Sequence, residues 1–271
     1  MFHIDERMRT VKNIIIVTAV ILSIAGCRKG DDSSETNPNN KIYYTTTDGL
    51  WPISTAPSTL GSNMISDTYE NGQGIMTFLG PVIWLGDHSF ANTTRLKTIT
   101  IPSSVRQIGY NPFAYCDNLS DFYGKFSSSD NRCLIQDGTL KSFAPAEMTV
   151  YSVPAGVTVI GKHAFINNTL NEIDIPDSVT EIESEAFRSS INNIIRINIG
   201  KGITKIGNYA LYCGTYHCYV YCKAAVPPVA EGNLFYDCDK ITVYVPRESV
   251  EAYKAASGWD QYAENIFGYD F

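Results

Sequence analysis

The chain has 271 residues, which is enough for one large domain or two small ones. Hydrophobic residues make up 44% of it and charged residues 18%, so a sizeable core can form and broad disorder is excluded. The formal net charge is -7, and the sequence shows no basic patch of the kind that binds phosphate backbones. These features argue against nucleic acid as a partner.

Residues 1–26 are predicted to form a signal peptide. Basic residues precede an apolar run from Ile14 to Ala25, which is too short to cross a bilayer as a helix but is typical of a signal-peptide core. The run ends in the letters SIAGC, which resemble the bacterial lipoprotein box, and the resemblance implies lipidation of Cys27. The alternative is an ordinary signal peptide that happens to contain a cysteine.

Residues 27–40 are predicted to form a flexible tether. The letters after Cys27, RKGDDSSETNPNN, include no apolar residue that could anchor the segment in a core. The acidic pair Asp31 and Asp32 resembles the export signal of surface lipoproteins in Bacteroidetes. The resemblance implies an exported, surface-exposed outer-membrane lipoprotein that is attached to the membrane through the lipid on Cys27.

A repeated unit, V-x-x-I-G-x-x-x-F, dominates residues 75–245. It occurs at Val105–Phe113 and Val157–Phe165, and divergent copies begin at Val82, Val179 and Ile203. Copies that follow one another directly begin 22 to 24 residues apart, which is within the range of leucine-rich repeats. A unit of this size cannot bury its own apolar face, so stacking of the copies is expected.

Each unit also contains one strand in which polar and apolar residues alternate. Examples are LKTITIP, LNEIDIP, IIRINIG and KITVYVP, which begin at Leu96, Leu170, Ile194 and Lys240. The alternation buries one face of each strand, and stacked copies would place the strands side by side in a parallel sheet. The predicted fold is mainly β: a leucine-rich-repeat solenoid of 22–24-residue coils behind an N-terminal β cap at residues 41–74.

Two segments depart from the repeat. Between Ser120 and Thr149 the sequence predicts a β-hairpin that turns at Asp137 and Gly138 in place of a regular coil. Residues 246–271 are predicted to form a helical cap, because Arg247–Ala256 suits a short helix. The residues expected to cover the last coil are Trp259, Tyr262 and Ile266.

The pattern I-x-I-P-x-S-V-x-x-I-G-x-x-A-F-x-x-C-x-x-L resembles the BspA-like leucine-rich repeat of bacterial surface proteins. Glu183 stands where this pattern has glycine, and Leu211 stands where it has phenylalanine. The resemblance implies an adhesin-like surface protein that presents its repeats to a host or bacterial macromolecule. The alternative is a glycan-binding accessory protein of a surface polysaccharide system. The partner is thus an unknown protein or glycan, and a monomer without cofactor is expected.

Six cysteines remain after Cys27: Cys116, Cys133, Cys213, Cys218, Cys222 and Cys238. Cys116 and Cys238 stand in the repeat column that holds Thr93, Asn168 and Ser190 in other coils, so buried thiols are expected there. Disulfides between Cys213 and Cys238, or between Cys218 and Cys222, are the alternative. No cysteine spacing predicts a zinc site.

The histidines His88 and His163 share a repeat column. At least two coils separate them, which predicts a distance of about 10 Å or more, too far to share one metal ion. His163 is expected to pair with Glu185 of the next coil at the surface. No motif of a nucleophile, a phosphate loop or a metal-dependent hydrolase is present, so neither a catalytic residue nor a metal is predicted and the chain is not expected to be an enzyme.

The outward strand positions predict two rows of side chains on the concave face. The first row is Thr98, Asp121, Glu172, Arg196, Tyr219, Thr242, and the second is Thr100, Tyr123, Asp174, Asn198, Tyr221, Tyr244. Exposed tyrosine is typical of contact surfaces for proteins or sugars, although it is also simply a favourable strand residue. The candidate ligand-binding residues are Arg196, Tyr219, Tyr221, Tyr244 and Tyr123.

Overall fold

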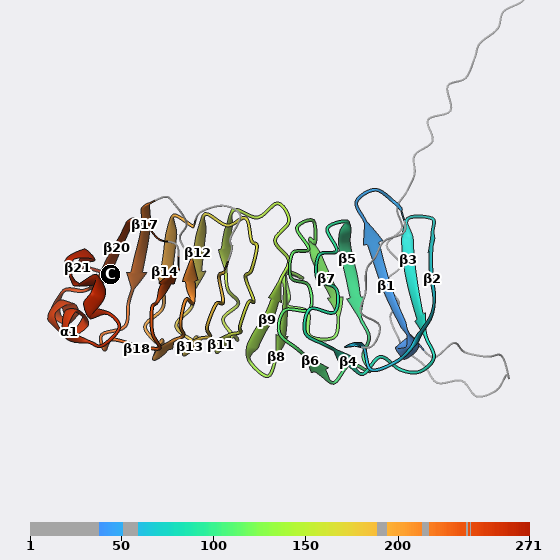
Figure 1. Cartoon of the computed structure of the whole chain (residues 1–271), viewed down its shortest axis with the longest axis horizontal. Helices are drawn as coiled ribbons and strands as arrows, with labels where there is room; N and C mark the ends of the chain where they lie inside the picture. Colours follow the sequence, from blue (N-terminus) through green and yellow to red (C-terminus); the bar gives the residue numbers. More distant parts are fainter. Residues whose placement is uncertain (1–37, 51–58, 189–193, 213–216, 237, 239) are drawn as a thin grey trace, which may run out of the picture. The chain divides into compact units, whose positions relative to one another are not determined.

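A computed structural model describes residues 38–50, 59–188, 194–212, 217–236, 238 and 240–271 (Figure 1). The predicted signal peptide, the lipidation residue Cys27 and most of the predicted tether lie outside the described residues. The end of the tether forms the short 3-10 helix η1 (Pro38–Asn40). Within the described ranges, no helix is long and apolar enough to cross a membrane.

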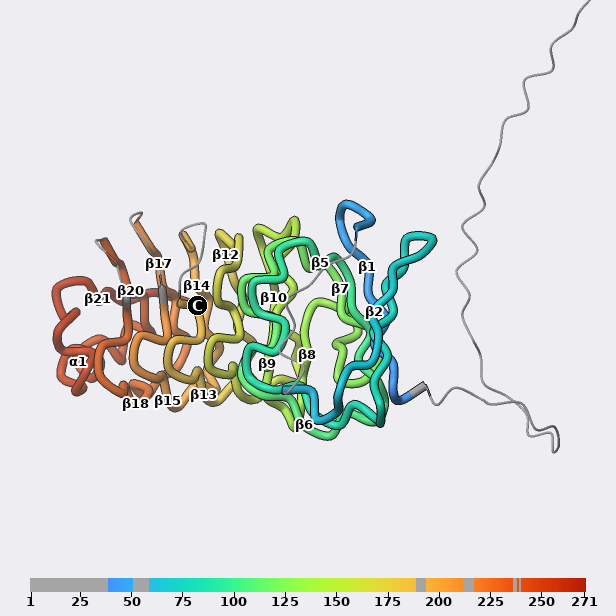
Figure 2. Tube along the Cα trace, turned by 45° about the vertical axis from the view of Figure 1, so that its right-hand side comes forward, coloured from blue at the N-terminus to red at the C-terminus, as the bar shows by residue number. Residues whose placement is uncertain are grey.

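The C-terminal half of the repeat region forms two facing sheets, because each coil contributes one strand to each sheet (Figures 1 and 2). The front sheet is parallel and has the order β10 (Val150–Ser152), β12 (Glu172–Ile175), β14 (Arg196–Ile199), β17 (His217–Cys222), β20 (Lys240–Pro246), β21 (Ile266–Tyr269). The back sheet has the order β18 (Val229–Ala230), β15 (Lys205–Ile206), β13 (Glu181–Ile182), β11 (Val159–Ile160), β9 (Thr139–Phe143), β8 (Cys133–Gln136). The predicted parallel solenoid is confirmed.

The repeated apolar residues form the core between these sheets. Val157, Ile160 and Phe165 of one copy are fully buried, as the equivalent residues of the next copy are. Phe165 packs against the phenylalanine of the coil on either side, with its ring centroid 4.9 Å from that of Phe143 and 4.8 Å from that of Phe187. From the front sheet, Ile197 and the residues equivalent to it complete the core, while the residues on either side of them point outward.

The N-terminal half has a mixed sheet, here called the N-terminal sheet. Its order is β2 (Met64–Glu70), β3 (Gln73–Phe78), β1 (Lys41–Thr46), β5 (Leu96–Ile101), β7 (Asp121–Gly124). Strands β1 to β3 are antiparallel to their neighbours, and β5 and β7 pair in parallel. The antiparallel strands cover the edge of β5, which would otherwise expose unpaired backbone groups. Two short strands, β4 (Trp84–Leu85) and β6 (Gln107–Ile108), pair behind this sheet.

The N-terminal and front sheets are separate. β7 is the last strand of the N-terminal sheet and β10 is the first strand of the front sheet. β7 ends at Gly124, which has a positive φ of 83°, and a Cβ atom there would meet the carbonyl oxygen of Ile101 at 2.3 Å. The chain then leaves the repeat register and enters the hairpin.

The predicted hairpin is confirmed. β8 and β9 pair antiparallel, and Asp137 (φ 50°) and Gly138 (φ 76°) form the turn between them. β9 also pairs in parallel with β11, so the hairpin extends the back sheet. The next strand, β10, was not predicted, although Tyr151 is buried between two outward residues as in the regular coils.

The C-terminal helical cap is also confirmed, and it contains more elements than the one short helix that was predicted. It contains the 3-10 helix η3 (Arg247–Ser249), helix α1 (Val250–Ala255), the 3-10 helix η4 (Asp260–Asn265) and the unpredicted strand β21. Trp259 and Tyr253 are fully buried, and each donates a hydrogen bond of 2.8 Å to a backbone carbonyl of the preceding coil. Near the repeat's end, β16 (Leu211–Tyr212) pairs with β19 (Phe235–Tyr236).

The cysteines that the structure describes lie in the hydrophobic core or pack against it. Cys116 is buried and its Sγ atom lies 3.1 Å from the carbonyl oxygen of Phe90, as expected for its column. Cys218 and Cys222 are both free and buried, so the suggested disulfide between them is wrong: four residues along a strand span about 13 Å, whereas a disulfide needs Cα atoms within about 7 Å. Cys238 is partly buried against the core, and Cys213 lies outside the described residues.

Candidate functional site

The strand register confirms the outward rows but divides them between two sheets. In the front sheet the first row runs Val150, Glu172, Arg196, Tyr219, Thr242, and the second runs Ser152, Asp174, Asn198, Tyr221, Tyr244, Phe267. Thr98, Thr100, Asp121 and Tyr123 belong to the N-terminal sheet instead. The structure therefore brings together the candidate residues Arg196, Tyr219, Tyr221 and Tyr244, and it places Tyr123 in a different surface.

The C-terminal end of the front sheet carries a surface that we call the aromatic face, formed by Tyr219, Tyr221, Tyr244, Phe267 and Tyr269. The rings of Tyr221 and Tyr244 stack with their centroids 4.8 Å apart, and Tyr269 lies 5.3 Å and 5.5 Å from these two rings. Phe267 and Tyr269 are 49% and 42% exposed. Burial raises the pKa of the Tyr221 hydroxyl, which stays protonated and able to donate at neutral pH.

Arg196 borders the aromatic face. Its guanidinium carbon lies 5.3 Å from the ring centroid of Tyr221, a cation–π distance, and its Nε atom lies 3.9 Å from a carboxylate oxygen of Glu172. Asp174 accepts hydrogen bonds from Asn198 at 2.6 Å and from Ser152 at 3.1 Å. A hydrogen-bonded polar border thus adjoins the stacked rings on the same sheet face.

Two members of the aromatic face and two residues beside it were not predicted. Phe267 and Tyr269 come from β21, and Phe271 follows with its ring centroid 5.1 Å from that of Tyr269. His217 stacks on Tyr219 with ring centroids 4.6 Å apart, and its Nε2 atom lies 2.8 Å from the Oγ1 atom of Thr242. The letters IFGYDF alternate as a strand does, and this was the available signal for the missed aromatic residues.

Comparison with known proteins identifies the repeat. A family model described as BspA type leucine rich repeat region matches residues 73–143 and 139–256, with six copies. The chain belongs to this family. A leucine-rich cell-surface protein from Faecalibacterium prausnitzii has a similar fold, with a TM-score of 0.50 and 21% identity over 70% of this chain and 52% of that one.

The comparison with solved structures also returned two proteins with lower TM-scores. A leucine-rich repeat protein from Eubacterium ventriosum has 24% identity and a TM-score of 0.46 over 62% of this chain and 46% of that one. The pneumococcal vaccine antigen PcpA has 16% identity and a TM-score of 0.35 over 69% and 58%. The chain thus spans about half the length of these proteins. The comparison with curated proteins gave no match.

The two histidines of the BspA-type repeat lie closer together than predicted. The ring centroids of His88 and His163 are 5.9 Å apart, with the planes 30° from parallel. The coil between them places Asn111 at the equivalent position, but that side chain is buried, accepts a hydrogen bond from Ser142 and donates one to the carbonyl of His163 at 2.6 Å. With Asn111 turned inward, the imidazoles stack. Among the described residues, no three His, Cys, Asp or Glu side chains gather to hold a metal ion.

The predicted pair of His163 and Glu185 is confirmed, with 2.6 Å between Nε2 and Oε2. Glu185 also accepts a hydrogen bond of 3.1 Å from Arg188. The bond to His163, and then that to Arg188, lower the pKa of the Glu185 carboxyl. Its charge therefore stabilises the folded chain above the unfolded-state pKa of about 4.3, and this contribution is lost as the pH falls through the lower folded-state pKa.

We expect Glu185→Gln to reduce the acid sensitivity of folding. The free energy of unfolding of the variant should fall less steeply than that of the wild type as the pH drops below about 4.5, because one carboxylate no longer takes up a proton on unfolding. The effect should be small, since the pair is partly exposed. Urea titrations from pH 7 to pH 3 measure it, and identical pH slopes would contradict it.

Proposed function

We propose that this chain is a non-enzymatic binding protein that holds a partner protein on its aromatic face. The observation that carries the proposal is the set of mutually contacting rings of Tyr221, Tyr244 and Tyr269, with Arg196 beside them, outside the core. Tyrosine and arginine are enriched among the residues that contribute most to protein–protein affinity.

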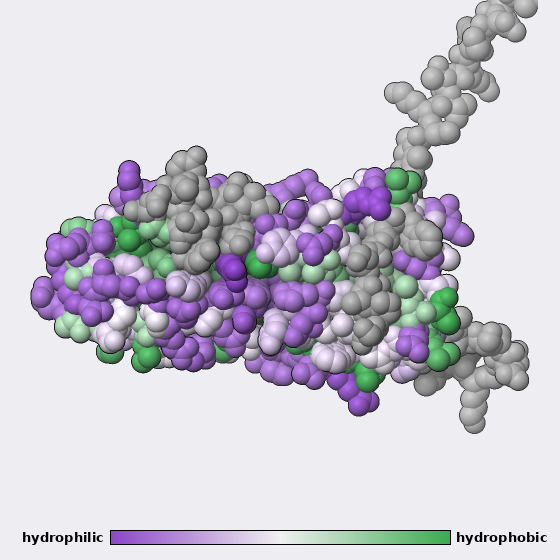
Figure 3. All heavy atoms as spheres, viewed as in Figure 1, coloured by the Kyte–Doolittle hydropathy of each residue, from purple (hydrophilic) through white to green (hydrophobic). Residues whose placement is uncertain are grey.

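The rigidity of the front sheet supports this role. Tyr221 and Tyr244 stand on hydrogen-bonded central strands, and each ring is held by its neighbours. Binding therefore immobilises few new rotamers, which lowers the entropic cost of association. The face seen in Figure 3 is mainly hydrophilic, and its hydrophobic residues lie in small separate groups. Exposed tyrosines are compatible with a hydrophilic surface, because their hydroxyl groups are hydrated in the free chain while the rings remain available for contact with a partner.

The place of action that we propose is the cell surface. The predicted signal peptide and the predicted lipid on Cys27 would anchor an exported monomer to the outer membrane, with residues 28–40 as the tether. The BspA-type repeat and the similarity of the fold to a protein described as a cell-surface protein support this place. A surface anchor and a protein-binding face are together the features of an adhesin, and the partner that we propose is a host matrix protein or a protein on other bacteria.

An array experiment tests the proposed function. The purified chain is applied to an array of host matrix proteins, bacterial surface proteins and glycans, and bound chain is detected with an antibody. We expect saturable binding to at least one protein, with affinity retained at moderate salt, since ring contacts rather than long-range charge supply the binding. Binding to glycans alone, or only at low salt, would contradict the proposal.

A further inference from the structure

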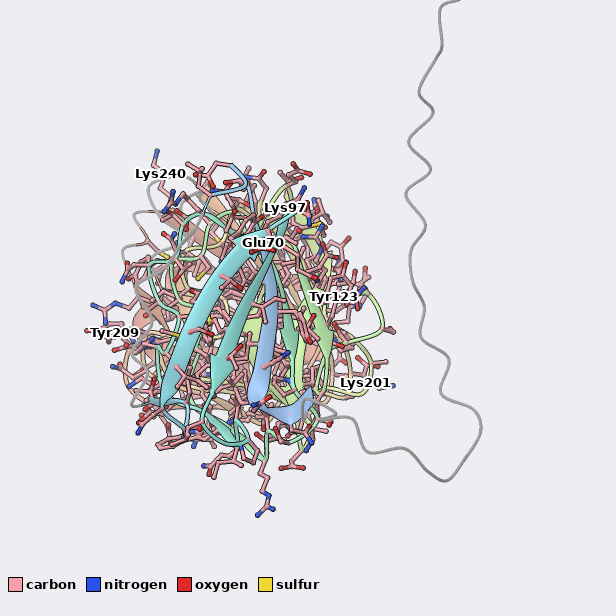
Figure 4. The ribbon with its side chains drawn as sticks, turned by 90° about the vertical axis from the view of Figure 1, so that its right-hand side faces the viewer. Glu70, Lys97, Tyr123, Lys201, Tyr209 and Lys240 are labelled. Atoms are coloured by element: carbon pink, nitrogen blue, oxygen red, sulfur yellow. The ribbon has the colours of Figure 1, made fainter. Side chains whose placement is uncertain are left out.

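A hollow of about 660 Å³ opens on the outward face of the N-terminal sheet. Its floor consists of two rows across β1, β5 and β7, which we call the hydroxyl groove: Tyr43, Thr100, Tyr123 in one row and Thr45, Thr98, Asp121 in the other. Gly72, in the turn between β2 and β3, and Gln73, the first residue of β3, also line the hollow. Figure 4 looks toward this sheet and labels Tyr123, on β7, and Lys97, a further lining residue.

The depth of the groove follows from side-chain size. Thr100 stands between Tyr43 and Tyr123, and strand spacing places the backbones of the two tyrosines about 10 Å apart. The short threonines of β1 and β5 therefore lie lower than the tyrosines on either side of Thr100. The hydroxyl oxygens of Thr45 and Thr98 are 2.7 Å apart, which fixes both threonine rotamers in the floor. The volume is typical of a site for a small ligand.

We propose that the hydroxyl groove binds an uncharged carbohydrate, at a site separate from the aromatic face. Its side chains are mainly hydroxyls, which both donate and accept hydrogen bonds as sugar hydroxyls do. Asp121 adds an acceptor, and Lys97 adds a donor of opposite charge, so the lining is neutral overall. The rings of Tyr43 and Tyr123 offer flat surfaces for the apolar side of a sugar ring.

Other ligand classes fit the hydroxyl groove less well. An apolar ligand would gain little, because the floor offers threonine and carboxylate in place of aliphatic surface. A phosphorylated or sulfated ligand would meet Asp121 with only Lys97 as a balancing cation. An extended peptide could add backbone hydrogen bonds only at a sheet edge, and β1 and β5 have neighbours on both sides. β7 is an edge strand, but its Phe122 N–H already donates a hydrogen bond of 2.7 Å to the carbonyl oxygen of Asn131.

Titration with defined oligosaccharides tests this site. The purified chain is screened against neutral di- to tetrasaccharides of glucose, galactose, mannose and N-acetylglucosamine, together with their sulfated forms, and hits are titrated by calorimetry. We expect at least one neutral oligosaccharide to bind. Tyr123→Ala should weaken it about tenfold, and Thr100→Tyr, which fills the hollow with a favourable strand residue, should abolish it.

The control is Tyr110→Ala, which removes an exposed tyrosine outside the groove and should leave carbohydrate affinity unchanged. Thermal melting of each variant verifies folding. The proposal is overturned if no neutral oligosaccharide binds, if only sulfated forms bind, or if Thr100→Tyr melts like the wild type and binds with the same affinity. Because the aromatic face is intact in both groove variants, failure here leaves protein binding there unaffected.

Discussion

Replacing Tyr221 and Tyr244 together with alanine should weaken binding of the partner protein by about a thousandfold. The expectation combines two central residues that each contribute at the level of an interface hot spot, about 2 kcal/mol for each truncation. The two rings support each other and Tyr269, so removal of both also frees the remaining ring. Titration of the protein that gives the strongest array signal, by calorimetry, measures the change.

Matched variants separate a contact effect from an unfolding effect. Tyr221→Phe and Tyr244→Phe keep the stacked rings and should retain most of the affinity for the partner protein. Arg196→Ala removes the cation beside Tyr221 and should weaken this affinity about tenfold. Tyr110→Ala, on an exposed turn away from the front sheet, should bind as the wild type does. Wild-type affinity in a folded double alanine variant would exclude the aromatic face as the binding site.

Phe165→Ala should lower the free energy of unfolding by about 3–5 kcal/mol. Phe165 is fully buried and its ring centroid lies 4.9 Å from that of Phe143 and 4.8 Å from that of Phe187, so the truncation opens a cavity in the middle of a stack. In a solenoid each coil is stabilised mainly by its neighbours, so a weakened coil also loosens the coupling across it. We expect a broader urea transition as well as a lower midpoint.

Two comparisons accompany this substitution. Phe165→Leu should lower the free energy of unfolding clearly less than Phe165→Ala does, because Leu211 fills the same repeat position in a later coil and is fully buried there. Val226→Ala, at a residue that is 76% exposed, should change stability by no more than about 0.5 kcal/mol. If Phe165→Ala unfolds at the same urea concentration as Val226→Ala, the phenylalanine stack is not the main support of the core.

The repeat made the fold predictable, because each coil must supply its own valine, isoleucine and phenylalanine to a shared core. The same periodicity predicted the outward register, in which Arg196 and Tyr219 are cross-strand partners and Tyr221 lies two residues further along the same strand. Such neighbours follow from counting residues, since one residue of slip would move every side chain to the other face.

The features that the sequence did not predict depend on contacts with segments that do not follow the repeat. The inward turn of Asn111, which lets His88 meet His163, requires a hydrogen bond from Ser142 of the hairpin, 31 residues away. The separation of Tyr123 from the other candidates follows from the backbone at Gly124, where the chain leaves the repeat. Strand β21 forms only because the cap returns the chain to the edge of β20.

Footprinting of the bound complex tests the central claim, that the aromatic face is where this BspA-type chain holds its partner. Hydroxyl radicals oxidise exposed aromatic side chains, and the chain is compared with and without the partner protein selected on the array. We predict protection concentrated at Tyr221, Tyr244, Phe267 and Tyr269, with Tyr110 and Tyr123 oxidised as in the free chain. Protection at Tyr110 or Tyr123 with the aromatic face unchanged would contradict the account.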